Sequence, residues 1–197
     1  MPDQPFHHGN LRAVLLDQAQ VVLRERGVDA LSLRELAREA GVSHGAPRNH
    51  FIDRAALLDA LAERGYMRLA DEIREAASQF PDDFAHALHA AGSAYVRFAA
   101  RESALLDLMF AAKVGDPSEA VRSAAECLFN TMTDIMSAGV EAGGYDARDV
   151  GRLTLVLSAT VQGISALVSS RRITTAQSEA LIDDAITLFL AGASTTR

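Results

Sequence analysis

Apolar residues recur every three to four positions along most of the chain, and this spacing predicts amphipathic helices. The first apolar stripe comprises Leu11, Val14, Leu15, Ala19, Val22 and Leu23. Asn10 can cap the start of this helix, and Gly27 suits the left-handed residue that follows a helix end. Alanine is abundant, whereas β-branched and aromatic residues are scarce, and no segment makes a convincing strand. We therefore predict an all-α fold of about nine helices.

Two short helices are expected after the first one. Ser32 and Glu35 have the spacing of a capping box, in which each side chain bonds the backbone amide of the other residue. Gly41 ends this second helix, and Ser43 can cap a third helix. Pro47 lacks an amide hydrogen and disfavours helix at the residue before it, so the third helix should be short with an irregular start.

Aspartate, proline and glycine residues divide the rest of the chain into longer helices. A long fourth helix begins after the Asp53 cap and ends at Pro81. Further helices are expected to begin near residues 83, 105, 117, 146 and 175. Three short helices thus precede the long ones, and we expect two domains, 1–53 and 54–197.

Composition excludes several classes of protein. The single cysteine, Cys127, allows neither an intrachain disulfide nor a cysteine-based zinc site, and a reducing cytoplasm fits this. The N-terminus lacks the charged and apolar regions of a signal peptide. No stretch approaches the roughly 18 uncharged apolar residues that cross a bilayer. We therefore expect a cytoplasmic protein without a membrane partner.

The second and third helices are joined by the short segment Gly41-Val42-Ser43. Two short helices across a glycine-containing turn are typical of a helix-turn-helix, whose second helix reads the major groove of DNA. The alternative is an ordinary core, because many cores also contain two short helices and a glycine turn.

Residues 6–62 also carry a series of family motifs in unbroken order. These are His7-His8-Gly9-Asn10-Leu11-Arg12, Glu25-Arg26-Gly27, the run from Leu31 to Ala37, Ala40-Gly41-Val42-Ser43, His50-Phe51, Asp53-Arg54 and Leu57-Leu58. Together they resemble the N-terminal domain of TetR/AcrR-family transcriptional regulators. The resemblance implies an all-helical homodimer with a three-helix DNA-binding head, a linking fourth helix and a C-terminal ligand-binding and dimerisation domain. It also implies two partners, a double-stranded operator and a small-molecule effector.

The candidate DNA-binding residues follow from this resemblance and from the docking geometry of a helix-turn-helix. They are Arg34, Ser43, His44, Gly45, Arg48, Asn49, His50 and Arg54. Arg48 stands where the family often has tyrosine; a guanidinium can pair with guanine or clamp a phosphate, and Asn49 can pair with adenine. For His50 the favoured interpretation is a packed or phosphate-facing position. For Arg34 the alternative to a phosphate or base contact is a solvated helix face.

The net charge of −7 argues at first against a polyanionic partner. Residues 1–68, however, contain nine arginines and nine acidic residues, whereas residues 69–197 contain ten basic and seventeen acidic residues. The acidic excess therefore belongs to the C-terminal part. A charge-balanced head can bind DNA if its positive groups share a face, and we predict a modest dependence on salt. His7 and His8 are expected to form a flexible arm near the DNA or to be disordered.

The last two helices are rich in apolar residues with small residues between them. We expect them to form a four-helix bundle with a second copy of the chain. The candidate dimer contacts are Leu153, Leu157, Val161, Ile164, Leu181, Ile186 and Phe189. The alternative is that these residues are buried within one chain.

A ligand cavity is expected in the middle of the C-terminal domain because the resembled family has one there. Its candidate lining residues are Phe98, Leu105, Met109, Phe110, Phe129, Met132, Met136 and Gln162. Methionine adapts its shape and suits apolar ligands. Few charged residues fall among these positions, so a largely apolar effector is expected; the alternative for each residue is ordinary core.

Catalytic and metal-binding patterns are weak. Asp82, His86 and His89 have helical spacing that could present metal ligands, but a solvated polar face is the favoured interpretation. Cys127 is expected to be a buried, inert thiol. We therefore expect no enzyme, metal or cofactor. The resemblance implies a DNA-binding regulator that acts as a repressor released from a palindromic operator by a small, largely apolar ligand. The alternatives are an activator or a ligand-independent regulator of the same fold, a helical enzyme without a recognisable catalytic constellation, and a helical protein-interaction module.

Overall fold

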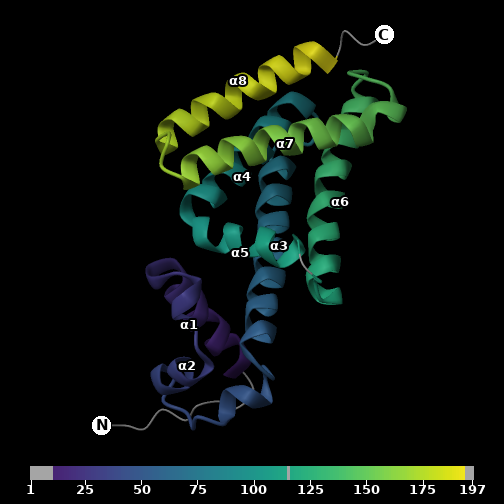
Figure 1. The fold of residues 1–197 in the computed structure, drawn as a ribbon. Helices are drawn as coiled ribbons and strands as arrows, with labels where there is room; N and C mark the ends of the chain where they lie inside the picture. The colour runs from purple at the N-terminus through teal and green to yellow at the C-terminus, as the bar shows by residue number, and fades with distance from the viewer. Residues whose placement is uncertain (1–10, 115, 194–197) are drawn as a thin grey trace. The chain divides into compact units, whose positions relative to one another are not determined.

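The computed structural model describes residues 11–114 and 116–193, and these ranges contain helices and no strand (Figure 1). The α-helices are α1 (Leu11–Arg26), α2 (Leu33–Glu39), α3 (Arg54–Ser78), α4 (Phe84–Arg101), α5 (Ser103–Val114), α6 (Glu119–Glu141), α7 (Val150–Ser169) and α8 (Thr175–Ala193). Three 3-10 turns, η2 (Val28–Ala30), η3 (Ala46–Asn49) and η4 (Ala147–Asp149), lie between them. The predicted all-α class is confirmed.

The third short helix differs from the prediction, because it is only the four-residue 3-10 turn η3. The described ranges therefore hold eight α-helices, and the expected ninth is this turn. Pro47 is the second residue of η3 and is buried. Its ring removes one amide donor and crowds the preceding turn, so an α-helix cannot be continuous through this position. The amides of His50 and Phe51 both bond the Pro47 carbonyl, at 3.0 and 2.9 Å.

The predicted capping box at the start of α2 is wrong. Ser32 has the extended backbone of an N-cap, but its side chain makes no capping hydrogen bond. Glu35 is instead drawn to Arg26, whose Nη1 donates to Glu35 Oε1 at 2.8 Å, while Arg26 Nη2 donates to Glu39 at 2.9 Å. A charge-assisted hydrogen bond is stronger than one to a neutral amide, which explains why the Glu35 carboxylate binds Arg26 and not the Ser32 amide. These carboxylates raise the pKa of Arg26.

Contacts divide the chain into two compact units, and α3 contributes to both. The first unit contains the described residues up to Gly65 together with Ala104–Arg122. The second contains Tyr66–Ser103 and the described residues from Ser123 onward. The functional division at residues 53 and 54 remains a prediction.

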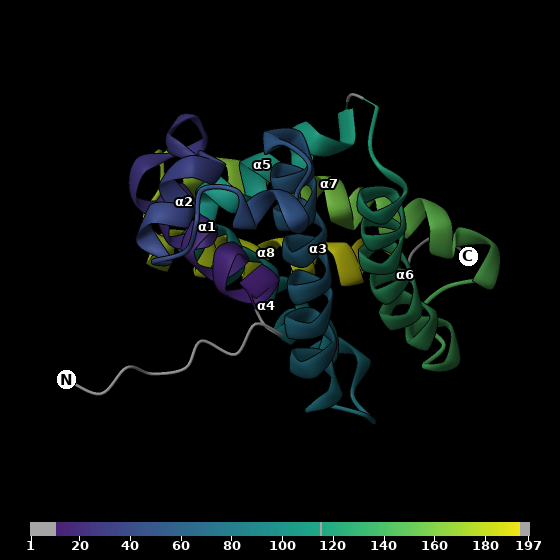
Figure 2. The same cartoon turned by 90° about the horizontal axis from the view of Figure 1, so that it is seen from below.

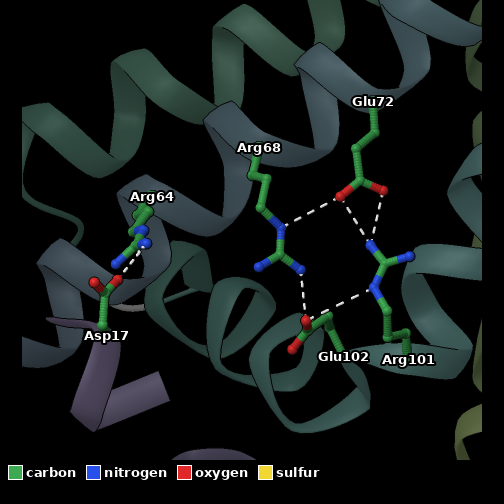
Figure 3. A network of polar contacts seen from close by, with 6 residues as sticks. All are labelled: Asp17, Arg64, Arg68, Glu72, Arg101 and Glu102. Carbon is green, nitrogen blue, oxygen red and sulfur yellow. Dashed lines mark hydrogen bonds and ion pairs between the residues drawn. The ribbon is translucent and has the colours of Figure 1, made fainter. Parts of the chain in front are cut away.

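The first unit is built on the apolar faces of α1, α2 and the first half of α3. Its most buried side chains include Leu15, Leu23, Leu36, Phe51, Leu57 and Leu61. Arg12 lies over the Phe51 ring, 5.5 Å from its centroid, and Arg64 of α3 lies 2.5 Å from Asp17 of α1 (Figure 3). At Gly65, α5 approaches α3 so closely that a Cβ atom would lie within about 2.6 Å of Met109 Sδ.

The second unit has α4 packed against both α7 and α8, which also contact each other. Gly92 of α4 permits this approach, since a Cβ atom there would meet Ile186 at 2.7 Å. The described part of α6 in this unit runs beside the second half of α3 (Figures 1 and 2), where Arg74 Nη2 donates to Thr131 Oγ1 at 2.9 Å. Tyr145 closes the end of α6 by donating its hydroxyl to the Met136 carbonyl at 2.5 Å.

Charged side chains join α3 to the junction of α4 and α5 within the second unit (Figure 3). Arg68 Nη2 lies 2.7 Å from Glu102 Oε1, and Arg101 Nη2 lies 2.8 Å from Glu72 Oε1. The Arg68 and Arg101 guanidinium groups also lie over the Phe98 ring, at 4.9 and 5.7 Å. Glu102 is only 4% exposed, so its charge depends on these cations.

The expectation that no stretch approaches the length and apolarity of a membrane span is wrong for one segment. Ala147–Ser169, which contains α7, is long and apolar enough to cross a membrane by length and composition. However, 44% of the most apolar 18-residue stretch of this segment is buried inside the fold. A core helix of a helical bundle has the same properties, and its contacts with α4 and α8 account for its apolar face.

Candidate nucleic-acid interface

The turn after α2 depends on the backbone of Gly41. Its φ of +66° is in the region that favours glycine. The amides of Gly41 and Val42 bond the carbonyls of Arg38 and Ala37, at 3.2 and 3.0 Å, which ends α2 as predicted. The chain then leaves toward Ser43 and η3, and this gives the helix-turn-helix its direction.

The side chains that the sequence assigns to DNA are exposed around this turn. Ser43, His44, Gly45, Arg48, Asn49, His50 and Arg34 are all exposed, whereas Pro47 and Phe51 face the core. Within residues 11–114 and 116–193, the structure gives no hydrogen bond or ion pair to the side chains of Arg34 and Arg48. Both guanidinium groups are therefore available to a phosphate or a base edge.

The acidic residues of α2 do not cancel this positive charge. Arg26 binds both Glu35 and Glu39, and Arg38 lies 3.5 Å from Glu35, so two guanidinium groups balance the two carboxylates of α2. The local balance around Arg34 and Arg48 is thus more positive than the zero net charge of residues 1–68. This arrangement answers the objection that the overall net charge of −7 raises.

Arg54 has a structural task in addition to its predicted DNA contact. Its Nε donates to the Leu31 carbonyl at 3.0 Å, and its Nη2 donates to the Val28 carbonyl at 2.6 Å. These bonds satisfy carbonyl groups at the η2 turn, so a phosphate would have to share the guanidinium with them. The cap before Arg54 is confirmed, because the Ala56 amide donates to Asp53 Oδ1 at 2.9 Å.

One residue of this surface was not identified from the sequence. Ile52 is 82% exposed, although it stands between the buried Phe51 and the capping Asp53. The signal was present, because an apolar residue that follows a core phenylalanine and precedes a helix cap has no place in the core. An exposed isoleucine here could contact a sugar or a thymine methyl group. The predicted histidine arm, His7 and His8, and the Asn10 cap lie outside the described residues.

The second unit encloses a small cavity, but it includes only two of the eight predicted pocket residues. The cavity has a volume of about 30 Å³, and its lining comprises Ile73, Leu88, Ala91, Gly92, Tyr95, Met132, Ile135, Met136, Thr154, Leu157 and Val161. Met132 and Met136 were predicted. A volume of this size holds one or two waters, whereas pockets for drug-sized ligands measure roughly 300–1,000 Å³.

The other six predicted pocket residues lie elsewhere. Phe98 is buried beneath the guanidinium groups of Arg68 and Arg101. Leu105 and Met109 pack at Gly65 in the first unit. Phe129 and Gln162 are exposed, and Phe110 is half-buried. These residues were assigned to a pocket because the resembled family has one, and helical spacing alone does not show which helix face meets the cavity.

The cavity carries no charged group. Burial raises the pKa of Tyr95, so its phenol stays neutral. Thr154 donates its hydroxyl to the Val150 carbonyl at 2.8 Å and is therefore satisfied within its own helix. The remaining walls are aliphatic or thioether groups, which suit an apolar ligand.

Five of the seven predicted dimer contacts are already buried within one chain. Leu153, Leu157, Val161, Ile164 and Ile186 are at most 6% exposed. Phe189 is half-buried, and Leu181 is 38% exposed. The apolar or small residues that α7 and α8 leave exposed include Leu155, Val156, Ala159, Gly163, Ala166, Leu181 and Leu188. A second chain can reach these positions, and we name them the α7–α8 face.

The histidine array on α4 is used by separate pairs. His86 Nδ1 lies 2.7 Å from Asp83, and His89 Nδ1 lies 3.2 Å from Asp183 of α8. Hydrogen bonds from the His86 amide and ring hold the pKa of Asp83 below its usual range. Within the described ranges, no group of three histidine, cysteine or acidic residues could hold a metal ion. Cys127, which was expected to be buried, is half-buried and free.

Comparisons with known proteins agree with this geometry. Residues 15–61 match the family described as bacterial regulatory proteins of the tetR family, and residues 88–189 match the tetracyclin repressor-like C-terminal domain. The second match alone covers more than half of the chain. None of the curated proteins matches the sequence significantly.

Solved structures give the same picture. A Rhodococcus sp. RHA1 protein of unknown function is 39% identical, with a TM-score of 0.88 over 96% of this chain and 98% of that one. A regulatory protein of the tetR family from Rhodococcus RHA1 is 21% identical, with a TM-score of 0.69 over 95% and 98%. The fatty acid degradation regulator FadR from Bacillus halodurans is 19% identical, with a TM-score of 0.72 over 91% and 98%. The last two show similarity of fold alone.

Proposed function

Because the chain belongs to the TetR family, whose members are non-enzymatic DNA-binding transcriptional regulators, we propose that it is a homodimeric repressor released from a palindromic operator by a small, largely apolar ligand. The observation that carries this proposal is the exposed, unpaired set of polar side chains around η3. We place this regulator in the cytoplasm, where its operator DNA is accessible.

The first unit supplies the DNA contacts. Arg48 and Asn49 lie on η3 and are exposed, so they are the best placed to reach base edges in the major groove. Ser43, His44 and Gly45 precede η3, where side chain and backbone can approach a phosphate. Arg34 and His50 add positive or polar groups at the sides.

The α7–α8 face supplies the dimer contact. Its exposed leucines offer apolar area, and Ala159, Gly163 and Ala166 allow close helix approach. Two such faces related by a twofold axis would form the expected four-helix bundle, and a dimer of heads would match a palindromic site.

Ligand response requires two states that bind the ligand differently. In the proposed mechanism, ligand in the cavity of the second unit favours one tilt of α3, and this tilt sets the separation of the two heads. A ligand that bound both states equally would change nothing. Met132 and Met136 are flexible side chains that could make room for it.

A ligand-independent regulator of the same fold is the second candidate. The observation that favours it is the cavity volume of about 30 Å³, which is too small for a ligand of ordinary size. Thermal unfolding followed across a panel of small apolar compounds separates the two candidates, because a ligand that binds only the folded state raises Tm.

The DNA-binding half of the proposal is tested by selection from random duplexes. We expect the purified full-length chain to enrich one palindromic sequence, with half-sites spaced to suit a twofold dimer. Transcription in vitro from a promoter that contains the selected site should then fall when the protein is added. The absence of any enriched sequence would overturn the proposal.

A further inference from the structure

An open groove of about 510 Å³ lies on the second unit between the end of α3, the start of α4 and α6. Its walls are partly apolar, with Phe80, Phe84 and Ile135 among the lining residues. Three carboxylates, those of Asp82, Asp134 and Glu141, also line it. The groove is therefore amphipathic, and its charged groups are mostly acidic.

The one cation among the lining residues of this groove is already engaged. Arg74 Nη1 donates to Asp71 Oδ1 at 2.6 Å, and Arg74 Nη2 donates to Thr131 Oγ1 at 2.9 Å. Among residues 11–114 and 116–193, by contrast, the structure gives no ion-pair partner to Asp82, Asp134 or Glu141. An occupant of the groove would therefore meet uncompensated negative charge.

The groove and the small inner cavity share a wall. Ile135 lines both, and its neighbours on α6, Met132 and Met136, line the cavity alone. Met132 and Met136 are flexible, whereas Ile135 is β-branched and stiffer, so entry from the groove to the cavity requires a change of rotamer at Ile135 itself, with the methionines adapting around it. A ligand that displaced Ile135 would have one end among apolar side chains and the other among carboxylates.

We propose that the groove and the cavity together bind an amphipathic monocation, such as a hydrophobic amine or a quaternary ammonium compound. This inference rests on the proposed function, because it takes the cavity to be the effector site. The apolar part would enter the cavity as Ile135, Met132 and Met136 move to enlarge it beyond its present volume of about 30 Å³, and the cationic head would lie near Asp134 and Glu141. Phe80, which lines the groove and is 40% exposed, adds an aromatic ring that attracts a cation. A fatty acid anion would face the same carboxylates without compensation.

The methionines provide a direct test by NMR. The full-length chain labelled with ¹³C at its methionine methyl groups is titrated with octyltrimethylammonium, octanoate or octanol, each below its micelle concentration. We expect octyltrimethylammonium to shift the signals of Met132 and Met136, while Met67 and Met109, which line neither space, stay unchanged. Octanoate should bind at least about tenfold more weakly, since it repeats the tail with the opposite charge.

A charge-removal variant separates the head-group site from the cavity. In the double variant Asp134→Asn with Glu141→Gln, we expect octyltrimethylammonium to bind about fivefold more weakly, while octanol binding is unchanged. The matched control, Glu126→Gln with Glu179→Gln, removes two exposed carboxylates that do not line the groove and should bind the cation like the original chain.

The outcomes distinguish this inference from the proposed function. Equal binding of the cation and octanoate, or equal binding by the two double variants, would overturn the cationic site while leaving an apolar effector cavity. Failure of all three probes to shift Met132 and Met136 would overturn both the inference and the ligand-responsive half of the proposed function. The DNA selection experiment does not depend on either result.

Discussion

At the scale of single residues, we expect the exposed side chains around η3 to determine how selectively the first unit can read DNA. Arg48 has no partner within the described ranges, whereas Arg54 is bound to two backbone carbonyls. Two arginines that look alike in the sequence therefore differ in what they can offer a nucleic acid. The difference is tertiary, because it depends on where the η2 turn places its carbonyl groups.

For Arg48→Ala we expect a loss of about 1–3 kcal/mol in operator binding, since one bidentate base contact is worth this much. If Arg48 reads a base, the preference at one operator position also relaxes; a loss that is uniform across sequences would assign it to phosphate. Fluorescence anisotropy with the selected duplex and its single-base variants measures both. Arg97→Ala, an exposed arginine of α4, is the control, and an unchanged affinity for Arg48→Ala would contradict the assignment.

Gly41→Ala tests the turn itself. We expect a loss of about 1–2 kcal/mol in unfolding free energy, because an L side chain at φ +66° is strained even though the space around it is open. Gly151→Ala makes the same chemical change inside α7, also in open space, and should be neutral or stabilising. Urea denaturation of both variants decides; equal effects would show that backbone conformation is not the cause.

Tyrosine burial sets the behaviour at alkaline pH. Burial raises the pKa of Tyr66 and of Tyr145 to about 12 in the folded chain, above the ordinary value of 10.0. The folded state therefore holds these protons more tightly, and the associated stability is present below pH 10 and lost as the pH rises toward 12. We expect the urea midpoint to fall across this window and to fall less in Tyr145→Phe. An identical pH profile for the variant would exclude Tyr145 as a contributor.

At the scale of elements, the sequence predicted the helices well, because an apolar stripe every three to four residues survives any tertiary arrangement. The sequence-based prediction failed where a single residue outside the apolar stripe changed the local structure. Pro47 reduced a helix to a 3-10 turn, and Arg26 captured the Glu35 carboxylate that the capping box required.

The candidate site was predictable only in part for the same reason. Exposure of Arg48 and Asn49 follows from local sequence, because the buried Pro47 fixes which side of η3 faces the core. The lining of the cavity does not follow from local sequence. Leu105, Met109 and Met132 have similar apolar neighbours along the chain, yet Leu105 and Met109 lie in the first unit and Met132 lies in the second. The packing of the neighbouring helices determines which face of a helix lines the cavity.

We expect the α7–α8 face to form the contact between two copies of the chain. Leu188 is 73% exposed and belongs to a face that also exposes Leu155 and Leu181, and a group of exposed apolar side chains is typical of a protein interface. We expect a dimer of about twice 21.1 kDa in sedimentation at micromolar concentration, and dissociation to monomer in Leu188→Glu. Val114→Glu places the same charge at an 86% exposed valine of α5 and should remain dimeric. A monomer for the original chain would refute the dimer.

At the scale of the whole molecule, the distribution of charge matters more than its sum. The acidic excess lies after residue 68, and the arginines around the helix-turn-helix have few carboxylates free to oppose them. DNA binding should therefore depend on the geometry of two heads more than on bulk attraction.

The salt dependence of operator binding measures this balance. If each subunit contacts about three phosphates, the slope of log K against log salt should be near −5 for the dimer. Titrations of the selected duplex between low and physiological salt give this slope directly. A value near −10 would mean that many more phosphates are neutralised than the exposed arginines of the first unit suggest.

The two arginines Arg64 and Arg68 lie one turn apart on α3, and they are anchored in different units, Arg64 to Asp17 and Arg68 to Glu102. An α-helix turns by about 100° for each residue. Inserting a single residue between them would turn one anchor by about 100° about the helix axis relative to the other, whereas inserting four would turn it by only about 40° and lengthen the helix by about 6 Å. We therefore expect relatives of this chain to differ in the length of α3 at this point by nearly whole helical turns.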